Sequence, residues 1–190
     1  MADPAKRAAW TEAATDYALE NGLIGLSLRP LAVALGTSDR MLLYHFADKD
    51  DLVAEVLLTS SDRSVALISE LPDAPDPTAA VLALWRAHQG SEQLHRCQRM
   101  YVEAAALGLF GKEPYASAVG QANARWMTAL VGYLVRSGVP ASVGERAAVL
   151  VDAVLMGLQL DEPLQSSELE ESALRDLAGV VAQIASSGQR

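Results

Sequence analysis

The sequence has few of the features that mark secreted, membrane-embedded or disulfide-stabilised proteins. Its one cysteine, Cys97, cannot form an intrachain disulfide, which is typical of a protein from a reducing compartment. No run of 18 residues is free of both charges and helix breakers, so no membrane span is expected. The opening residues, MADPAKRAAW, contain no apolar signal core. These absences predict a cytoplasmic protein with no membrane partner.

Aromatic and basic residues are also scarce. Aromatic side chains make up 5% of the chain, whereas alanine and leucine recur throughout, which favours helices over sheets. The 15 basic residues are outnumbered by 24 acidic ones, giving a formal net charge of -9. This balance argues against a protein that coats nucleic acid, but it leaves room for a local DNA-reading face. With 51% hydrophobic residues among 190, a folded chain with a substantial core is expected.

Glycine, proline and capping residues divide the N-terminal part of the chain into short helical segments. A first helix is expected to end at Gly22. Ser27 and Ser38 are expected to cap two short helices that Gly36 separates. Asp48 is expected to cap a longer helix from Lys49 to about Leu71.

The C-terminal part of the chain has the periodicity of longer helices. Residues 72–77 contain three prolines and cannot be helical, so they form the best internal boundary. Five longer helices follow, and the last two are expected at about 143–161 and 168–186. Ser142 with Glu145, and Ser167 with Glu170, have the spacing of capping boxes for these two helices. No period-two strand pattern occurs, so the predicted fold class is all-α.

Residues 27–46 have the pattern of a helix-turn-helix. The two short helices meet at Leu35-Gly36-Thr37, where glycine allows the second helix to cross the first steeply. Leu31 and Leu42 have the spacing to pack the pair together. In such a motif the exposed end of the second helix enters the major groove of DNA. The residues left near that end are Thr37, Ser38, Asp39, Arg40, Met41, Leu43 and Tyr44.

Over about residues 6–60 the chain resembles the TetR family of transcriptional regulators. The matching residues are Glu20-Asn21-Gly22, Ser27-Leu28-Arg29, Leu31-Ala32, Leu35-Gly36-Thr37-Ser38, Leu42, Tyr44-His45-Phe46 and Lys49 leading to Leu52. The resemblance implies an N-terminal three-helix DNA-binding domain, residues 1–50. It also implies a C-terminal helical bundle, residues 51–190, that binds a small molecule and dimerises. The expected protein is a ligand-responsive regulator that binds operator DNA as a homodimer, with repression as the family's usual mode.

The predicted DNA-binding residues include positions where the chain departs from the family. The set is Ser27, Arg29, Thr37, Ser38, Asp39, Arg40, Met41, Leu43, Tyr44, His45 and Lys49. The family usually has a small residue where Arg40 stands, and a phosphate-contacting tyrosine where Leu43 stands. Arg40 is either a base reader or a solvated arginine, and Asp39 either accepts from a cytosine or matches the helix dipole. Tyr44, His45 and Lys49 are each either phosphate ligands or ordinary surface or core residues.

Charge supports a rival interpretation of the N-terminal part. Residues 1–60 contain five basic and nine acidic side chains, although residues 26–49 contain three basic and two acidic ones. Non-specific DNA binding is therefore expected to be weak and very sensitive to salt. The rival is a helical protein that binds a ligand or a partner and no longer binds DNA.

Two further sets of residues are candidates for ligand binding and dimerisation. The ligand set, which is otherwise core, is Trp85, Met100, Tyr101, Glu103, Phe110, Trp126 and Met127, with Glu103 as its polar member. The dimer set lies on the last two helices, which otherwise form a monomeric bundle: Val151, Val154, Leu158, Ala173, Leu177 and Val181. The chain has no nucleophile elbow, no phosphate loop and no His-Glu-x-x-His run, so no enzyme, metal or cofactor is expected.

Overall fold

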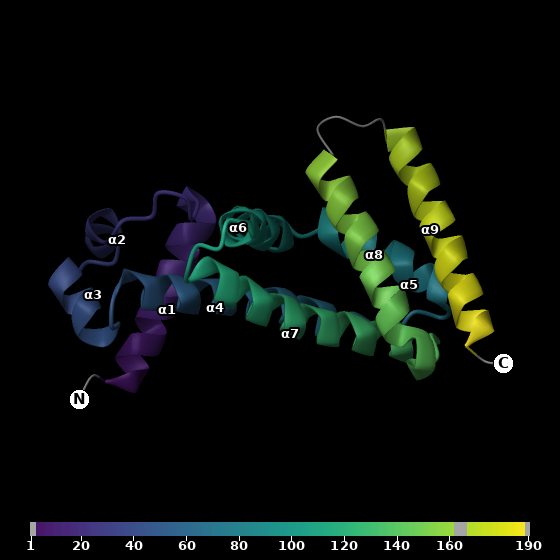
Figure 1. Ribbon diagram of the computed structural model, residues 1–190, viewed down its shortest axis with the longest axis horizontal. Helices are drawn as coiled ribbons and strands as arrows, with labels where there is room; N and C mark the ends of the chain where they lie inside the picture. Colours follow the sequence, from purple (N-terminus) through teal and green to yellow (C-terminus); the bar gives the residue numbers. More distant parts are fainter. Residues whose placement is uncertain (1–2, 162–166, 189–190) are drawn as a thin grey trace. The chain divides into compact units, whose positions relative to one another are not determined.

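The computed structural model describes residues 3–161 and 167–188 of the chain (Figure 1). These residues form nine α-helices joined by short turns, as expected for an all-α fold. The helices are α1 (Pro4–Asn21), α2 (Leu28–Ala34), α3 (Asp39–His45), α4 (Lys49–Ser69), α5 (Pro77–Gln89), α6 (Glu92–Leu109), α7 (Tyr115–Arg136), α8 (Ala141–Asp161) and α9 (Ser167–Ser187). None of the helices in this part of the chain combines the length and apolar character needed to cross a membrane.

Two of the predicted helix caps, those of Ser38 and Asp48, are confirmed, and Asp76 provides a third cap. The Ser38 hydroxyl accepts a hydrogen bond from the Met41 backbone N–H at 3.2 Å, at the start of α3. The carboxylate of Asp48 accepts from the Asp51 N–H at 2.8 Å, just before α4. Asp76 caps α5 in the same way at 2.8 Å, and Pro77 occupies the first turn, where no N–H is needed.

Other cap predictions are wrong. Ser27 precedes α2 but makes no side-chain cap. Helix α8 begins at Ala141, so Ser142 lies inside the helix, and its hydroxyl donates to the Gly188 carbonyl at 3.4 Å. The predicted box of Ser167 with Glu170 depends on a side chain outside the part that the structure describes; the Glu170 carboxylate itself accepts from the Trp85 indole at 3.2 Å. At α8, a tertiary partner therefore replaced the predicted local one.

Contacts divide the chain into two compact units. The first comprises residues 1–65 and 93–125, and the second comprises residues 66–92 and 126–190. This division differs from the predicted boundary at residue 50. The reason is that α6 and the first half of α7 pack with the N-terminal helices. Their residues Met100, Ala104 and Ala118 are buried in the same core as Leu31 and Leu42.

The first unit has its core where α1, α2, α3 and α4 meet. Leu23, Leu31, Leu42 and Leu52 are completely buried there, and Phe46 is nearly so. The two short helices α2 and α3 pack against each other, and α1 packs against α2 (Figure 1). A three-helix head with a helix-turn-helix is therefore present, as the sequence predicts.

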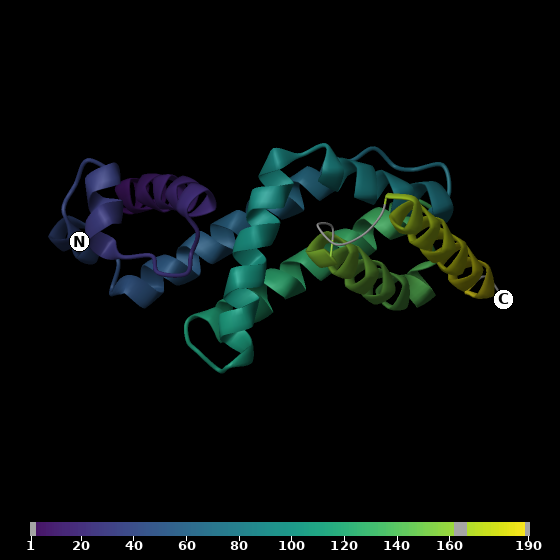
Figure 2. The same cartoon turned by 90° about the horizontal axis from the view of Figure 1, so that it is seen from above.

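The second unit is built from α5, α8, α9 and the second half of α7. Helix α9 packs against both α5 and α8, and Figure 2 shows α8 in green beside α9 in yellow. Tyr133, Leu134, Ala147, Val151 and Val181 are among its fully buried side chains. The apolar run 147–158 thus supplies much of this core.

Candidate nucleic-acid interface and effector site

The turn between α2 and α3 depends on Gly36. Its φ of 63° lies in the left-handed region, which favours glycine. The next residue, Thr37, donates its backbone N–H to the Ala32 carbonyl at 2.8 Å, which closes the end of α2. Ser38 then caps α3. The turn at Gly36 and the cap at Ser38 together fix the direction of α3 relative to α2.

Helix α3 has one buried side and one exposed side. Leu42 and His45 face the core, with 0% and 6% of their surface exposed. At about 100° per residue, the opposite side of the helix carries Arg40, Leu43 and Tyr44. All three are exposed, Leu43 to 46% and Tyr44 to 59%.

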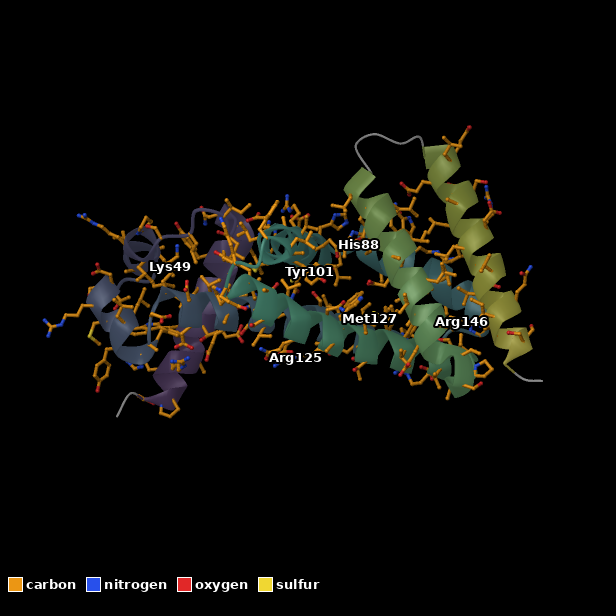
Figure 3. The ribbon with its side chains drawn as sticks, viewed as in Figure 1. Lys49, His88, Tyr101, Arg125, Met127 and Arg146 are labelled. Carbon is orange, nitrogen blue, oxygen red and sulfur yellow. The ribbon has the colours of Figure 1, made fainter. Side chains whose placement is uncertain are left out.

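The remaining predicted DNA-binding residues surround this exposed side, except for His45. Ser27, Arg29, Ser38, Asp39 and Met41 are exposed, and Thr37 and Lys49 are half-buried. Lys49 begins α4, close to the helix-turn-helix in sequence (Figure 3). Within the described residues, neither Arg29 nor Arg40 forms an ion pair. Both guanidinium groups are therefore available to another molecule.

His45 packs on the buried side of α3. Its ring meets the Trp10 ring edge-on at 4.7 Å and the Tyr44 ring at 5.2 Å. Its Nδ1 atom has no hydrogen-bond partner among the described residues. Of the two alternatives that the sequence left open, burial favours the core.

Arg7 is a structural residue that the sequence analysis did not identify. Its guanidinium donates to the Asp51 carboxylate at 3.0 Å, to Glu55 at 2.6 Å and to the His45 carbonyl, and it stacks on the Phe46 ring. The hydrogen bond that Arg7 donates to Glu55 raises the pKa of Arg7, and Asp51 adds to the effect against the cost of burial. Its partners lie 38 to 48 residues away in sequence, so no local signal could have revealed them.

Two cations from outside residues 1–60, Arg63 and Arg96, offset part of the acidic excess noted in the N-terminal sequence. Arg63 pairs with Glu12 at 2.5 Å and with Asp16 at 2.7 Å, and Arg96 lies 3.9 Å from Glu20. With Asp51 and Glu55 held by Arg7, five of the nine acids in residues 1–60 have a cationic partner. The charge of this region is therefore a weaker objection to DNA binding than the sequence count indicates.

The predicted ligand-binding residues do not gather in one unit. Met100, Tyr101, Glu103 and Phe110 belong to the first unit, and Trp85, Trp126 and Met127 to the second. Met100 is a core residue of the first unit, with 1% exposed, whereas Phe110 is 83% exposed. Neither environment is that of a pocket wall.

Glu103 has a structural partner in the first unit. One carboxylate oxygen, Oε2, accepts from the backbone N–H groups of Leu23 and Ile24 at 2.7 and 2.8 Å. A side chain at Gly22 would meet this carboxylate, because a Cβ there would lie 3.3 Å from Oε1. Glu103 therefore holds the loop between α1 and α2, and its assignment as the polar group of a ligand site is corrected.

Asp152 is a polar group in the second unit that the sequence analysis passed over. Its carboxylate accepts from the Trp126 indole N–H at 2.7 Å. Burial raises the pKa of Asp152, and the hydrogen bond from Trp126 opposes this only in part. The signal was visible, because Asp152 is the only charged residue in the apolar run 147–158.

Most of the predicted dimer residues are buried within the chain itself. Val151 and Val181 are 0% exposed, Leu177 5% and Leu158 8%, all in the core of the second unit. Val154 and Ala173 are partly buried against the same core. The surface that α8 and α9 leave open instead carries Val149, Leu160, Leu169 and Val180, which are 60%, 53%, 68% and 43% exposed.

A helix-turn-helix with a capped and solvent-facing second helix defines the class of protein as a DNA-binding regulator. Residues 11–56 match the family model described as bacterial regulatory proteins, tetR family. This match covers 46 of the 190 residues and includes the helix-turn-helix, so the N-terminal part of the chain is a DNA-binding domain of the tetR type. No curated protein sequence matches it.

Several solved structures resemble nearly the whole chain. A transcriptional regulator from Rhodococcus sp. Rha1 is 28% identical, with a TM-score of 0.73 over 93% of this chain and 96% of that one. GusR from Salmonella enterica is 21% identical, with a TM-score of 0.66 over 98% of both chains. The multidrug binding protein EbrR, solved in complex with imidazole, is 19% identical, with a TM-score of 0.66 over 95% of this chain and 96% of that one. The last two similarities concern the fold alone.

Proposed function

We propose that this regulator represses transcription by binding operator DNA as a homodimer, and that a small apolar or amphipathic molecule releases it. The observation that carries the DNA contact is the exposed side of α3, with the unpaired Arg40 at its centre. Arg40 reads a base edge, because a guanidinium can donate two hydrogen bonds to guanine. Repression itself is supported only by the usual behaviour of the family.

Phosphate contacts would come from the residues around α3. Arg29 and Lys49 supply charge, and Ser27, Thr37, Ser38 and Tyr44 supply hydroxyl groups. The backbone at the start of α4 adds N–H groups, although Asp48 already accepts one of them. With few cations in the segment, the affinity depends on these donors as well as on charge.

A homodimer is supported by the apolar residues that α8 and α9 expose. On α8, Val149, Ala153 and Leu160 recur at helical spacing on an open side, and Leu169 and Val180 do so on α9. Two copies of this surface would pair as a four-helix interface. This surface replaces the buried residues first expected there.

The effector is proposed to bind in the second unit, near Trp126, Met127 and Asp152. Met127, labelled in Figure 3, and its neighbour Trp126 are only half-buried. The Asp152 carboxylate, which accepts from the Trp126 indole, provides one polar anchor beside them. An acidic anchor and a chain of net charge -9 disfavour an anionic effector. EbrR, whose fold is similar, is a multidrug binding protein, which is consistent with a small-molecule effector.

Selection of duplexes from a random library, followed by binding measurements at fixed salt, tests the DNA contact. Arg40→Ala is expected to lower the affinity by about 1–3 kcal/mol per half-site and to relax preference at one position. Lys49→Ala is the matched control, since it is expected to weaken all sequences alike and to flatten the salt slope. A protein that selects no duplex would instead be the helical binding protein without DNA affinity.

A further inference from the structure

The exposed side of α3 carries apolar side chains that folding does not require. Leu43 is 46% exposed and Met41 39% exposed, whereas the core contacts of the helix come from Leu42 and His45. Leu43 also lies where the resemblance implies a phosphate-contacting tyrosine, and it has no group that can donate to phosphate. Leu43 is therefore suited to an apolar contact with a bound molecule rather than to a phosphate contact.

The major groove offers one such contact. Among the edges of the four bases, only thymine presents a methyl group there, and apolar side chains make contact with it. Leu43 follows Arg40 by three residues, so the two side chains are neighbours on the helix surface, about 5–6 Å apart at Cβ. Met41 precedes Tyr44 by three residues, so these two side chains are also neighbours. Around the helix, Met41 lies on the side of Arg40 opposite to Leu43. The apolar side chains thus flank the proposed base reader.

We infer that Leu43 and Met41 contact the 5-methyl groups of thymines in base pairs next to the one that Arg40 contacts. The inference rests on the DNA contact proposed above. It adds that the protein prefers thymine in the base pairs next to the one that Arg40 contacts. It also gives the acidic chain a source of DNA affinity that depends little on salt, because an apolar contact releases no counterions.

The test uses the full-length protein and the duplex that it selects from a random library. Each thymine of that duplex is replaced singly by uracil, which removes only the 5-methyl group, and dissociation constants are measured by fluorescence anisotropy. We expect one or two uracil positions per half-site to weaken wild-type binding about fourfold, the effect of one buried methyl group. Leu43→Ala should bind the thymine and uracil duplexes with equal dissociation constants at one of these positions, and Met41→Ala should do so at the other.

Val33→Ala is the matched control, because Val33 is 74% exposed on α2, outside the exposed side of α3. It should keep the uracil pattern of the wild type, and circular dichroism should show all three variants folded. A selected duplex without any uracil-sensitive position overturns the inference and leaves the DNA contact intact. Equal uracil sensitivity in wild type, Leu43→Ala and Met41→Ala overturns it as well. A protein that selects no duplex overturns both proposals.

Discussion

At the scale of single residues, Arg7 links three helices of the first unit. It joins α1 to the end of α3 and to the first turns of α4 through Asp51, Glu55 and the His45 carbonyl. Arg7→Ala would leave two partly buried carboxylates without their cation, so we expect the free energy of unfolding to fall by about 2 kcal/mol. Urea denaturation measures this change.

Arg175 provides the control for Arg7. It is 66% exposed and lies 3.7 Å from Glu171, one turn away on α9. Arg175→Ala should change the free energy of unfolding by less than about 0.5 kcal/mol. Equal effects of the two substitutions would show that the contacts of Arg7 add nothing to stability.

Asp152 makes stability depend on pH in a direction that can be worked out. Because burial raises its pKa in the folded state, its protonated form is favoured there, and its contribution to stability is lost as the pH rises through that pKa. Asp152→Asn cannot ionise, and its carbonyl can still accept from Trp126. We therefore expect Asp152→Asn to have a higher free energy of unfolding than the wild type at pH 7. The difference should shrink as the pH falls to about 4.

Urea denaturation at a series of pH values provides the measurement for Asp152. Asp176→Asn is the control, because Asp176 is exposed on α9 and its substitution should not raise the stability at pH 7 in the same way. A less stable Asp152→Asn at pH 7 would mean that the charged hydrogen bond to Trp126 outweighs the cost of burial. A stabilising substitution would fit a functional role for Asp152, since proteins retain unfavourable groups mainly at functional sites.

At the scale of elements, helix α6 holds the loop between α1 and α2 through Glu103. Removing the carboxylate in Glu103→Ala would free the backbone N–H groups of Leu23 and Ile24. We expect hydrogen exchange at these two amides to become faster, and the free energy of unfolding to fall by about 1–3 kcal/mol. Glu103→Gln keeps one acceptor oxygen and should retain part of the protection. Unchanged exchange in Glu103→Ala would exclude this role for the helix.

The sequence predicted where the helices begin and end better than it predicted which side of each helix is buried. The helix limits, the turn at Gly36 and the caps at Ser38 and Asp48 depend on neighbouring residues, so a local pattern was sufficient. The covered side of α8 was not predictable in this way, because residues 147–158 are apolar nearly all round and only tertiary packing, including that of α9, decides which side is buried. On α9 the sequence shows the apolar side, but not which element covers it.

Parts of the candidate site that depend on local spacing were predictable, whereas parts that depend on distant residues were not. The exposed side of α3 followed from its spacing in a short helix-turn-helix, and Arg40, Leu43 and Tyr44 lie on it as expected. Glu103 was misassigned because its partners lie about 80 residues away in the chain. Spacing along one helix cannot reveal such a contact.

At the scale of the whole molecule, the exposed residues of α8 and α9 should control the oligomeric state. Val149→Glu would place an unpaired charge in the proposed interface. This should weaken the dimer by about 3 kcal/mol, or roughly 100-fold, and weaken DNA binding with it. Sedimentation velocity measures the change, and circular dichroism should show an unchanged helix content, because Val149 is 60% exposed.

Two further variants separate the interface from the core. Leu177→Glu is expected to unfold the second unit, since Leu177 is only 5% exposed within the chain. Val33→Glu, on the exposed surface of α2, should leave the oligomeric state unchanged. A wild type that sediments as a monomer at micromolar concentration would contradict the proposed dimer.

The composition of the first unit limits how this regulator can be recombined with others. Met100, Ala104 and Ala118 complete the core around α1 to α4, although they follow it in sequence by at least 40 residues. A chimera joined at residue 50 would receive its operator-binding helices without these side chains, and would expose apolar surface that the native chain covers. Transplanting the specificity of this protein to a foreign sensor would therefore require grafting the surface residues of α3, and not exchanging the N-terminal segment as a cassette.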